Sequence, residues 1–268
     1  MEKRLGPTFH RTFGLISSGV AQVLRLGAAN PSCTKELLAE QTTLGPEQVN
    51  SVLRYAYGTR LLDASGALTT LGQFIFEKDP TLADQRTLWL LHYNLCASNS
   101  LAPAFWGQVV STAFRPETEL STQTVTRLIN EFYLTAPQIK FNGNSAQKCA
   151  SVLLGTYSDH RGLGSLGILR QITSGQYFVS EPHFPPLGAF AYILADFWEA
   201  NLSETVTAHF STVTQQLCPI LLTSSSVAKN ALGELQGQGL ARVQQRTAPY
   251  QIEKLWTSKA EVLRKLYD

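Results

Sequence analysis

The chain has 268 residues, of which 44% are hydrophobic and 16% are charged, and its formal net charge is +2. This balance is typical of a folded globular protein, because disordered chains lack the apolar surface that offsets their ordering entropy. No segment approaches the roughly 18 uninterrupted apolar residues of a membrane span. The Met-Glu-Lys-Arg start lacks the apolar region of a signal peptide, so the sequence predicts a cytoplasmic protein without membrane contact.

The cysteines indicate neither a zinc site nor a disulfide framework. They lie far apart, form no CxxC pair and have no histidine at metal-ligand spacing. We therefore expect buried thiols, no metal and no cofactor. The four residues are Cys33, Cys96, Cys149 and Cys218.

Charge is distributed unevenly along the chain. Residues 1–80 contain eight basic and seven acidic residues. Residues 81–215 contain seven basic and nine acidic residues, and residues 216–268 contain seven basic and four acidic residues. The local net charges are therefore +1, −2 and +3. A protein that coats nucleic acid carries a larger excess, because each neutralised phosphate needs a cation. Any surface of this protein that binds nucleic acid must therefore be confined to a small part of the chain.

Two helices joined by a tight turn are predicted near the N-terminus. Thr34 can cap a helix over 35–41, and Gly45-Pro46 then breaks the chain and starts a second helix over about 46–57. Val49, Val52, Leu53 and Ala56 repeat at helical spacing in the second helix, which indicates its buried face.

A hairpin is predicted to follow these helices. Segments 60–62 and 67–69 flank a four-residue turn that contains glycine, and Thr70 can cap a further helix. The order helix, helix, hairpin, helix indicates a winged helix-turn-helix domain over residues 1–80.

The second helix of this domain carries the candidate DNA contacts. In a winged helix bound to DNA this helix enters the major groove, where Asn and Arg form bidentate contacts with base edges. Asn50 and Arg54 are the candidates for such contacts. The alternative is that these residues form the solvated surface of a dimerisation or docking module. The predicted DNA-binding residues of the domain are Lys35, Asn50, Ser51, Arg54, Tyr55 and Arg60.

Residues 81–184 are predicted to form a central helical domain. Leucines at helical spacing indicate a core helix around His92, and we expect this histidine to be packed and hydrogen-bonded because no histidine or carboxylate stands at i+4. Ser121 and Ser145 can start further helices, and Gly175 indicates a hairpin.

A formal G-x-G-x-x-G occurs at Gly162, Gly164 and Gly167. A dinucleotide site needs a hydrophobic strand directly before the glycines. The preceding residues 156–161 (Thr-Tyr-Ser-Asp-His-Arg) do not form such a strand, so we interpret the motif as a loop.

The last segment, 185–268, repeats the pattern of the first. A long apolar helix follows Pro185-Pro186, and a helix capped by Ser225 or Ser226 precedes segments 240–245 and 251–256, which predict a hairpin. This order, closed by a last helix with Ser258-x-x-Glu261 as its capping box, predicts a second, winged-helix-like module, and a packing domain of the same shape is the alternative. Its candidate DNA-binding residues are Lys229, Asn230, Arg242 and Arg246.

Several motifs resemble a bacterial family of unknown function whose genes accompany DNA phosphorothioation, the sulfur modification of the DNA backbone. The likeness extends over nearly the whole chain. Arg11 stands where relatives usually carry Glu, and Gly155 stands where they often carry Arg. The motifs are Phe9-His10-Arg11-Thr12-Phe13, Val52-Leu53-Arg54-Tyr55, Leu68-Thr69-Thr70-Leu71-Gly72, Thr87-Leu88-Trp89-Leu90-Leu91-His92 and Ala191-Tyr192-Ile193-Leu194-Ala195-Asp196-Phe197-Trp198.

The resemblance implies a role in DNA modification and phage defence, with double-stranded DNA and the phosphorothioation proteins as partners. We therefore expect a mainly α, α+β protein that is a non-catalytic, DNA-binding accessory or regulatory factor. The alternative is a module that docks the modification enzymes or forms a homodimer without contacting DNA. An enzyme is disfavoured because the sequence lacks a P-loop, a G-x-S-x-G elbow, a zinc-ligand set and a close carboxylate pair.

Overall fold

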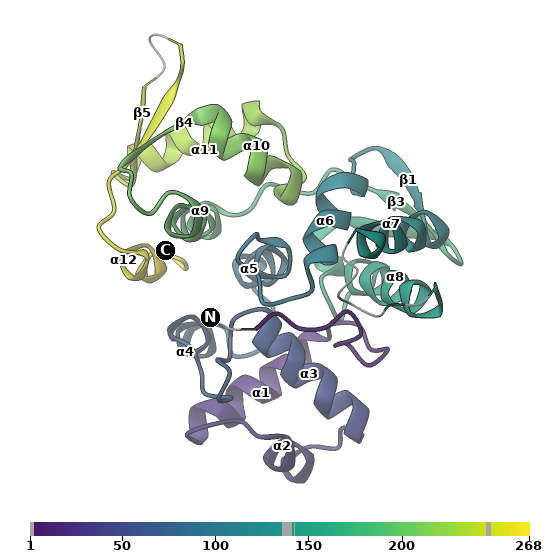
Figure 1. Ribbon diagram of the computed structural model, residues 1–268. Helices are drawn as coiled ribbons and strands as arrows, with labels where there is room; N and C mark the ends of the chain where they lie inside the picture. The colour runs from purple at the N-terminus through teal and green to yellow at the C-terminus, as the bar shows by residue number, and fades with distance from the viewer. Residues whose placement is uncertain (1–2, 136–140, 142, 245–247) are drawn as a thin grey trace.

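The computed structural model describes residues 3–135, 141, 143–244 and 248–268. The protein is a mixed α+β structure in which helices predominate and two small antiparallel sheets are present. Three groups of elements surround the central helix α5 (Gln85–Cys96) (Figure 1). We call them the N-terminal unit (residues 17–78, α1–α4), the middle unit (residues 104–179, α6–β3) and the C-terminal unit (residues 187–264, α9–α12).

The N-terminal unit is built from four helices. Its second helix begins after Thr34, whose side chain accepts a hydrogen bond from the Leu37 backbone, as predicted. The third helix begins with Pro46 and ends at Gly58, again close to the prediction. The helix before them was not predicted from the sequence. The four helices are α1 (Ser17–Ala29), α2 (Lys35–Gln41), α3 (Pro46–Gly58) and α4 (Thr70–Lys78).

The predicted hairpin between α3 and α4 is reduced to one isolated bridge between Leu62 and Leu68. The Asp63 carboxylate accepts hydrogen bonds from the backbone N–H groups of Ser65 and Ala67, which closes the turn locally. Thr69, one residue earlier than predicted, caps α4. The unit thus has the predicted element order with a shorter hairpin.

The region predicted to be a central helical domain also contains a sheet. Ser121 caps a helix as predicted, and a hairpin turns at Gly175, but a third strand precedes the capped helix. That strand has the sequence Thr-Glu-Leu-Ser and one buried residue, Leu120, so it carries almost no apolar signal. The elements after α5 are α6 (Ala104–Ala113), β1 (Thr118–Ser121), α7 (Thr122–Leu134), α8 (Gly143–Ser158), a 3-10 turn (Gly164–Leu166), β2 (Leu169–Thr173) and β3 (Gln176–Val179).

The C-terminal unit begins with the predicted apolar helix and ends with the predicted hairpin and short helix. Ser224 caps the helix before the hairpin, and Ser258 caps the last helix with its hydroxyl on the Glu261 backbone. The strand and helix between 207 and 221 were not predicted. The elements are α9 (Leu187–Asn201), β4 (Thr207–His209), α10 (Phe210–Leu221), α11 (Ser225–Gly237), β5 (Ala241–Gln244), β6 (Gln251–Lys254) and α12 (Lys259–Arg264).

The middle and C-terminal units share one connectivity. Each runs helix, short strand, two helices and hairpin, and in each the short strand pairs with the second strand of the hairpin, giving sheet orders β1-β3-β2 and β4-β6-β5. In both units the short strand leads directly into the next helix, at 121–122 and 209–210. The same supersecondary unit therefore occurs twice in the chain.

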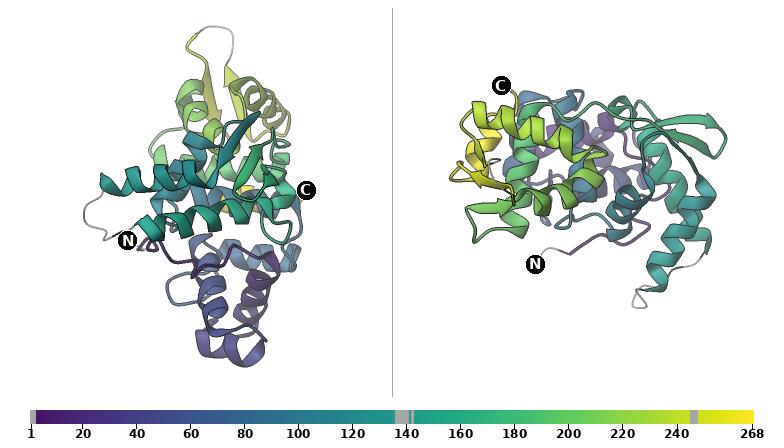
Figure 2. Two further views of the ribbon diagram at one scale, coloured as in Figure 1. Left: turned by 90° about the vertical axis from the view of Figure 1, so that its right-hand side faces the viewer. Right: turned by 90° about the horizontal axis from the view of Figure 1, so that it is seen from above.

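The three units are packed on one continuous hydrophobic core rather than on separate cores. The largest fully buried side chains, Trp89, Trp106 and Trp198, come from α5, α6 and α9. The left view in Figure 2 shows the N-terminal and C-terminal units at opposite ends of the molecule, with the middle unit between them. Within the described residues, no helix is long and apolar enough to cross a membrane.

A buried carboxylate on α9 connects the units. Asp196 is 1% exposed and accepts two hydrogen bonds from Arg60 (2.8 and 3.0 Å), one from Lys259 (2.7 Å) and one from Asn99 (3.2 Å). Burial alone would raise the pKa of Asp196, but the attraction of Arg60 and Lys259 outweighs it and lowers the pKa to about 2. The carboxylate thus joins the turn after α3 to the start of α12.

We expect Asp196→Asn to lower the free energy of unfolding by about 3 kcal/mol, because it leaves two largely buried cations without their counter-charge. Denaturant unfolding of the variant measures this change. Glu131→Gln is the matched control, since Glu131 pairs with Arg127 on an exposed helix face and such pairs contribute about 0.5 kcal/mol or less. Equal effects of the two substitutions would contradict the role given to Asp196.

His92 is a packed, hydrogen-bonded core residue, as predicted. Its Nε2–H donates to the Ile220 carbonyl at 2.8 Å, and its Nδ1 accepts from the Tyr157 hydroxyl at 2.9 Å. The Trp106 indole N–H donates to the same hydroxyl. Burial lowers the pKa of His92 to about 4, and burial does the same for His10.

Stability should fall as the pH is lowered from about 6.5 towards 4, because the unfolded chain protonates both histidines while the folded chain keeps them neutral. Each histidine contributes up to about 1.4 kcal/mol per pH unit in this window. His92→Gln should remove roughly half of the slope of unfolding free energy against pH between 6.5 and 5, whatever its effect at neutral pH. His160→Gln, at an exposed position, is the control, and an unchanged slope in His92→Gln would contradict the assignment.

Candidate nucleic-acid interface

Two of the predicted DNA contacts lie on the outer side of α3. Asn50 and Arg54 are one helical turn apart and partly exposed, and Glu47 lies a further turn towards the helix start. Within the described residues, Asn50 and Arg54 have no ion-pair or hydrogen-bond partner. Both side chains can therefore contact a ligand without breaking an internal bond.

Two other predicted contacts on α3 are wrong, because their side chains face the core. Ser51 is 1% exposed, and its hydroxyl has no hydrogen-bond partner in the described part of the chain. Tyr55 is completely buried, and its hydroxyl donates to the Phe13 carbonyl at 3.1 Å. More of the α3 surface is buried than the spacing of its apolar residues predicted, because the segment before α1 also packs against this helix.

Arg60 has a different role from the phosphate contact that we predicted. Its guanidinium forms a bidentate ion pair with the buried Asp196, which holds its charge inside the structure. The backbone of Arg60 has a φ of 63°, the left-handed conformation that turns the chain after α3. Lys35, the first residue of α2, is exposed as predicted.

The predicted contacts of the C-terminal unit are largely paired. Arg242 on β5 forms an ion pair with Glu253 on β6 at 2.7 Å, and the Lys229 ammonium lies 5.3 Å from the centre of the Tyr250 ring. Asn230 is exposed on α11. Arg246 lies outside the described residues. The positive charge of this unit is therefore partly balanced on its own sheet.

Exposed apolar side chains also lie on this sheet. Val206, Tyr250 and Leu255 are 56%, 40% and 39% exposed. The Lys254 N–H donates to the Val206 carbonyl, which places Val206 opposite Lys254 at the start of β4, and Leu255 follows Lys254 on the neighbouring strand with its side chain on the other face of the sheet. Exposed apolar groups at a sheet edge are typical of protein contacts.

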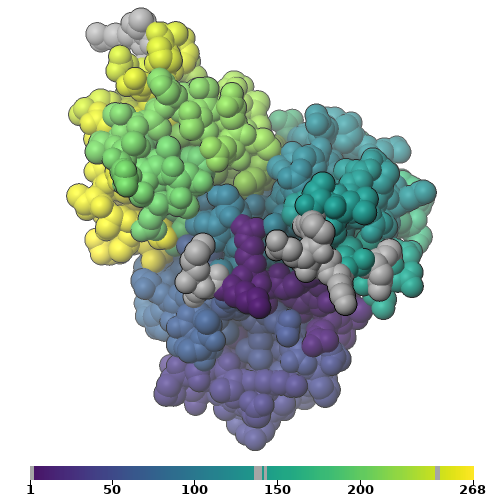
Figure 3. Space-filling model, in the orientation of Figure 1, coloured from purple at the N-terminus to yellow at the C-terminus, as the bar shows by residue number. Residues whose placement is uncertain are grey.

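The segment before α1 crosses between α3 and α8. We call residues 3–16 the N-terminal lead. Besides the Tyr55 contact with α3, the Leu15 N–H donates to the Thr156 hydroxyl of α8 at 3.1 Å. Phe9 and His10 of the lead are buried, whereas Arg11 is exposed and pairs with Glu47 at 3.6 Å. The space-filling view shows the lead at the surface where the three units meet (Figure 3).

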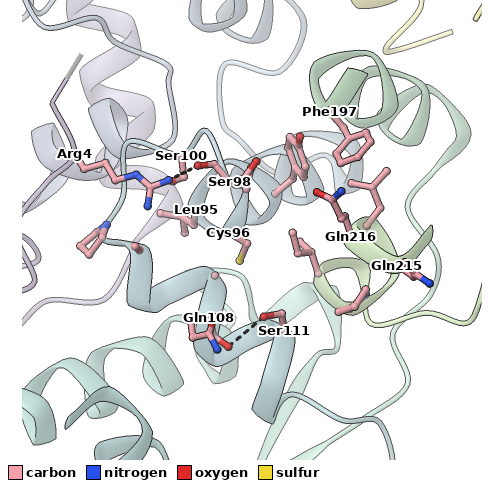
Figure 4. Close-up of a pocket in the computed structure, with 18 residues that line it drawn as sticks. Arg4, Leu95, Cys96, Ser98, Ser100, Gln108, Ser111, Phe197, Gln215 and Gln216 are labelled. Atoms are coloured by element: carbon pink, nitrogen blue, oxygen red, sulfur yellow. Dashed lines mark hydrogen bonds between the residues drawn. The ribbon is translucent and has the colours of Figure 1, made fainter. Parts of the chain in front are cut away.

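A cavity of about 450 Å³ lies between α5, α6, α9 and α10 (Figure 4). Its lining includes the amides of Gln108, Gln215 and Gln216 and the hydroxyls of Ser98 and Ser111. No carboxylate and no histidine belongs to the described residues that line it. The cavity therefore offers hydrogen bonding rather than acid–base chemistry.

The thiol of Cys96, which also lines this cavity, is not activated. Burial raises its pKa to about 12, so the sulfur stays protonated at neutral pH. The nearby His92 ring uses both nitrogens in hydrogen bonds. Among the described residues, no three His, Cys, Asp or Glu side chains are grouped so that they could hold a metal ion.

One known protein family matches most of this chain. A model described as a protein of unknown function, DUF4007, matches residues 43–248, which include α3, α8 and α11. The chain belongs to the DUF4007 family. The DUF4007 match begins after the N-terminal lead, so the Arg11 contact lies outside it.

The DUF4007 chain also has a fold similar to two solved structures, one described as SspB and one as magnesium ion-bound SspB. Each aligns with a TM-score of 0.76 over 97% of this chain and 86% of the SspB chain, at 15% sequence identity. At this identity the likeness establishes a shared fold. Among curated proteins, none matches the sequence.

Proposed function

We propose that this protein binds double-stranded DNA through α3 as an accessory or regulatory factor of a DNA phosphorothioation system. The observation that carries the proposal is the placement of Asn50 and Arg54, whose side chains are unengaged on the outer side of the second helix of a helix–turn–helix. We interpret the N-terminal and C-terminal units as winged helices, in which this helix enters the major groove.

The assignment of this protein to a phosphorothioation system rests on its family membership and on the resemblance of its sequence motifs. Membership of DUF4007 agrees with the family resemblance of the sequence motifs, which implies genes that accompany this modification. The likeness to SspB concerns the fold alone. The family resemblance therefore carries the proposal of a protein that works beside the modification enzymes, in the cytoplasm and on their DNA.

Arg54→Ala should weaken binding to a preferred duplex roughly fivefold to 150-fold, because a bidentate contact to a guanine edge contributes about 1–3 kcal/mol. Electrophoretic mobility shift at two salt concentrations measures the change. Arg25→Ala is the matched control, since Arg25 is an exposed arginine on α1 of the same unit. Absence of binding by the unmodified protein at micromolar concentration, or equal affinities for the two variants, would contradict the proposal.

A separate experiment tests the expectation that the protein does not cleave DNA. One of the SspB structures contains a magnesium ion, so supercoiled plasmid should be incubated with this protein and magnesium. We expect the plasmid to remain supercoiled. Conversion to the open circle, lost on addition of EDTA, would instead make the protein a nicking enzyme.

A second candidate function is docking of a phosphorothioation protein, or of a second copy of the chain, at the β4 edge. The exposed Val206 and Leu255 side chains at this end of the sheet favour this function, because exposed apolar groups lose contact with water when a partner covers them. The internal pairing of Arg242 with Glu253 favours it over DNA contact for this unit.

The double substitution Val206→Ser and Leu255→Ser should abolish co-purification with co-expressed phosphorothioation proteins in nuclease-treated extracts, and should shift any homodimer to monomer in light scattering. Ile172→Ser is the control, because Ile172 is comparably exposed (43%) on the sheet of the middle unit. Retention of every partner by the double variant would exclude docking at this edge.

A further inference from the structure

The cavity shown in Figure 4 lies where the middle and C-terminal units meet α5 and the N-terminal lead. The middle unit contributes α6, the C-terminal unit contributes α9 and α10, and the lead contributes Arg4. Its volume of about 450 Å³ is in the range of small-molecule sites, which occur preferentially at such junctions. We propose that this cavity binds a nucleoside monophosphate. The inference goes beyond the proposed function and does not depend on DNA binding through α3.

The walls of this cavity are almost without charge. Residues 97–114 and 205–228, which include α6 and α10, contain no Asp, Glu, Lys or Arg. Among the described residues that line the cavity, Arg4 is the only one with a charged side chain. A ligand that matches this lining therefore has a large uncharged part and one anionic group.

The charge of Arg4 can be used by such an anionic group. Its guanidinium donates a hydrogen bond to the Ser98 carbonyl, which leaves other N–H groups for a ligand. No carboxylate in the described part of the chain pairs with Arg4, so its charge is not neutralised. The neighbouring Leu5 N–H donates to the Leu101 carbonyl at 2.8 Å and fixes this part of the lead beside the cavity. Arginine N–H groups match the geometry of phosphate, so we assign the phosphate to this side.

The other side of the cavity offers hydrogen bonds to the edge of a base. Figure 4 shows Gln216 of α10 and Arg4 on opposite sides of the cavity. The side-chain amide of Gln216 has no hydrogen-bond partner within the residues that the structure describes. An amide donates and accepts at the same time, and a glutamine amide pairs in this way with N6 and N7 of adenine. Adenine is therefore the base that we expect.

The backbone of α10 adds an acceptor to this cavity. Pro219 lies inside α10, and both Pro219 and Gln215 belong to the lining. Because proline has no N–H, the Gln215 carbonyl one turn earlier loses its usual helical partner. This carbonyl can accept a hydrogen bond from an amino group of a ligand.

The remaining lining suits the base faces and the sugar. Tyr93, Leu95 and Phe197 are almost completely buried and give the cavity an apolar wall, against which the face of a base can pack. The hydroxyls of Ser98 and Ser111 donate to internal acceptors and keep lone pairs that can accept from sugar hydroxyls. Each part of a nucleoside monophosphate thus meets groups of matching chemistry.

The test measures binding of AMP, adenosine and inorganic phosphate by isothermal titration calorimetry. We expect AMP to bind more tightly than either of its parts. Arg4→Ala should lower the affinity for AMP roughly tenfold, towards that of adenosine, because it removes a hydrogen-bonded charge opposite the phosphate. Lys3→Ala is the matched control, since Lys3 is an exposed cation of the lead that does not line the cavity.

A second variant tests the side assigned to the base. Gln216→Leu should lower the affinity for AMP roughly fivefold, because it removes the paired hydrogen bonds to the base. Gln123→Leu, at an exposed position on α7, should leave the affinity unchanged. Arg4 and Gln216 are both exposed, and thermal unfolding of the variants checks that their folding is unaltered.

Three results would overturn the inference. They are the absence of AMP binding at millimolar concentration, binding of phosphate alone as tight as that of AMP, and unchanged AMP affinity in Arg4→Ala and Gln216→Leu. All three are measured without DNA, so they leave the proposed function as it is. A failure of DNA binding in the mobility shift would likewise leave this inference standing.

Discussion

The buried carboxylate of Asp196 is the interaction on which the arrangement of the units depends. Arg60 reaches it from the turn after α3, Asn99 from the segment after α5, and Lys259 from the start of α12. An unpaired carboxylate in this place would be strongly destabilising, so all three segments must be in position together. The relative placement of α3 and the C-terminal unit therefore depends on this charge network together with the shared hydrophobic core.

This constraint explains why the candidate interface is distributed over the molecule. The units share one core, and the N-terminal lead runs between α3 and α8 with Phe9 buried and Arg11 exposed. DNA bound at α3 would meet the lead next, because Arg11 pairs with Glu47 on that helix. The C-terminal unit, with paired charges and an apolar sheet edge, is better suited to hold a protein partner.

Local signals were sufficient to predict much of the fold. Thr34, Ser121 and Ser258 cap helices at the positions predicted from their hydroxyl groups and from the spacing of the apolar residues that follow them. The sequence could not predict which faces the lead would cover, so Tyr55 was assigned to the surface although it is buried. Arg60 looks like a phosphate contact in sequence because its partner is 136 positions away. The strand β1 was missed because it buries one residue.

Hydrogen–deuterium exchange with and without a DNA duplex tests the central claim most directly, because it locates the contact without changing a residue. We expect slower exchange on DNA binding in α3 and in the lead around Arg11, while α7 and the β4 edge stay unchanged. Protection confined to the C-terminal unit, or no protection in α3 under conditions where the protein is saturated with DNA, would contradict it.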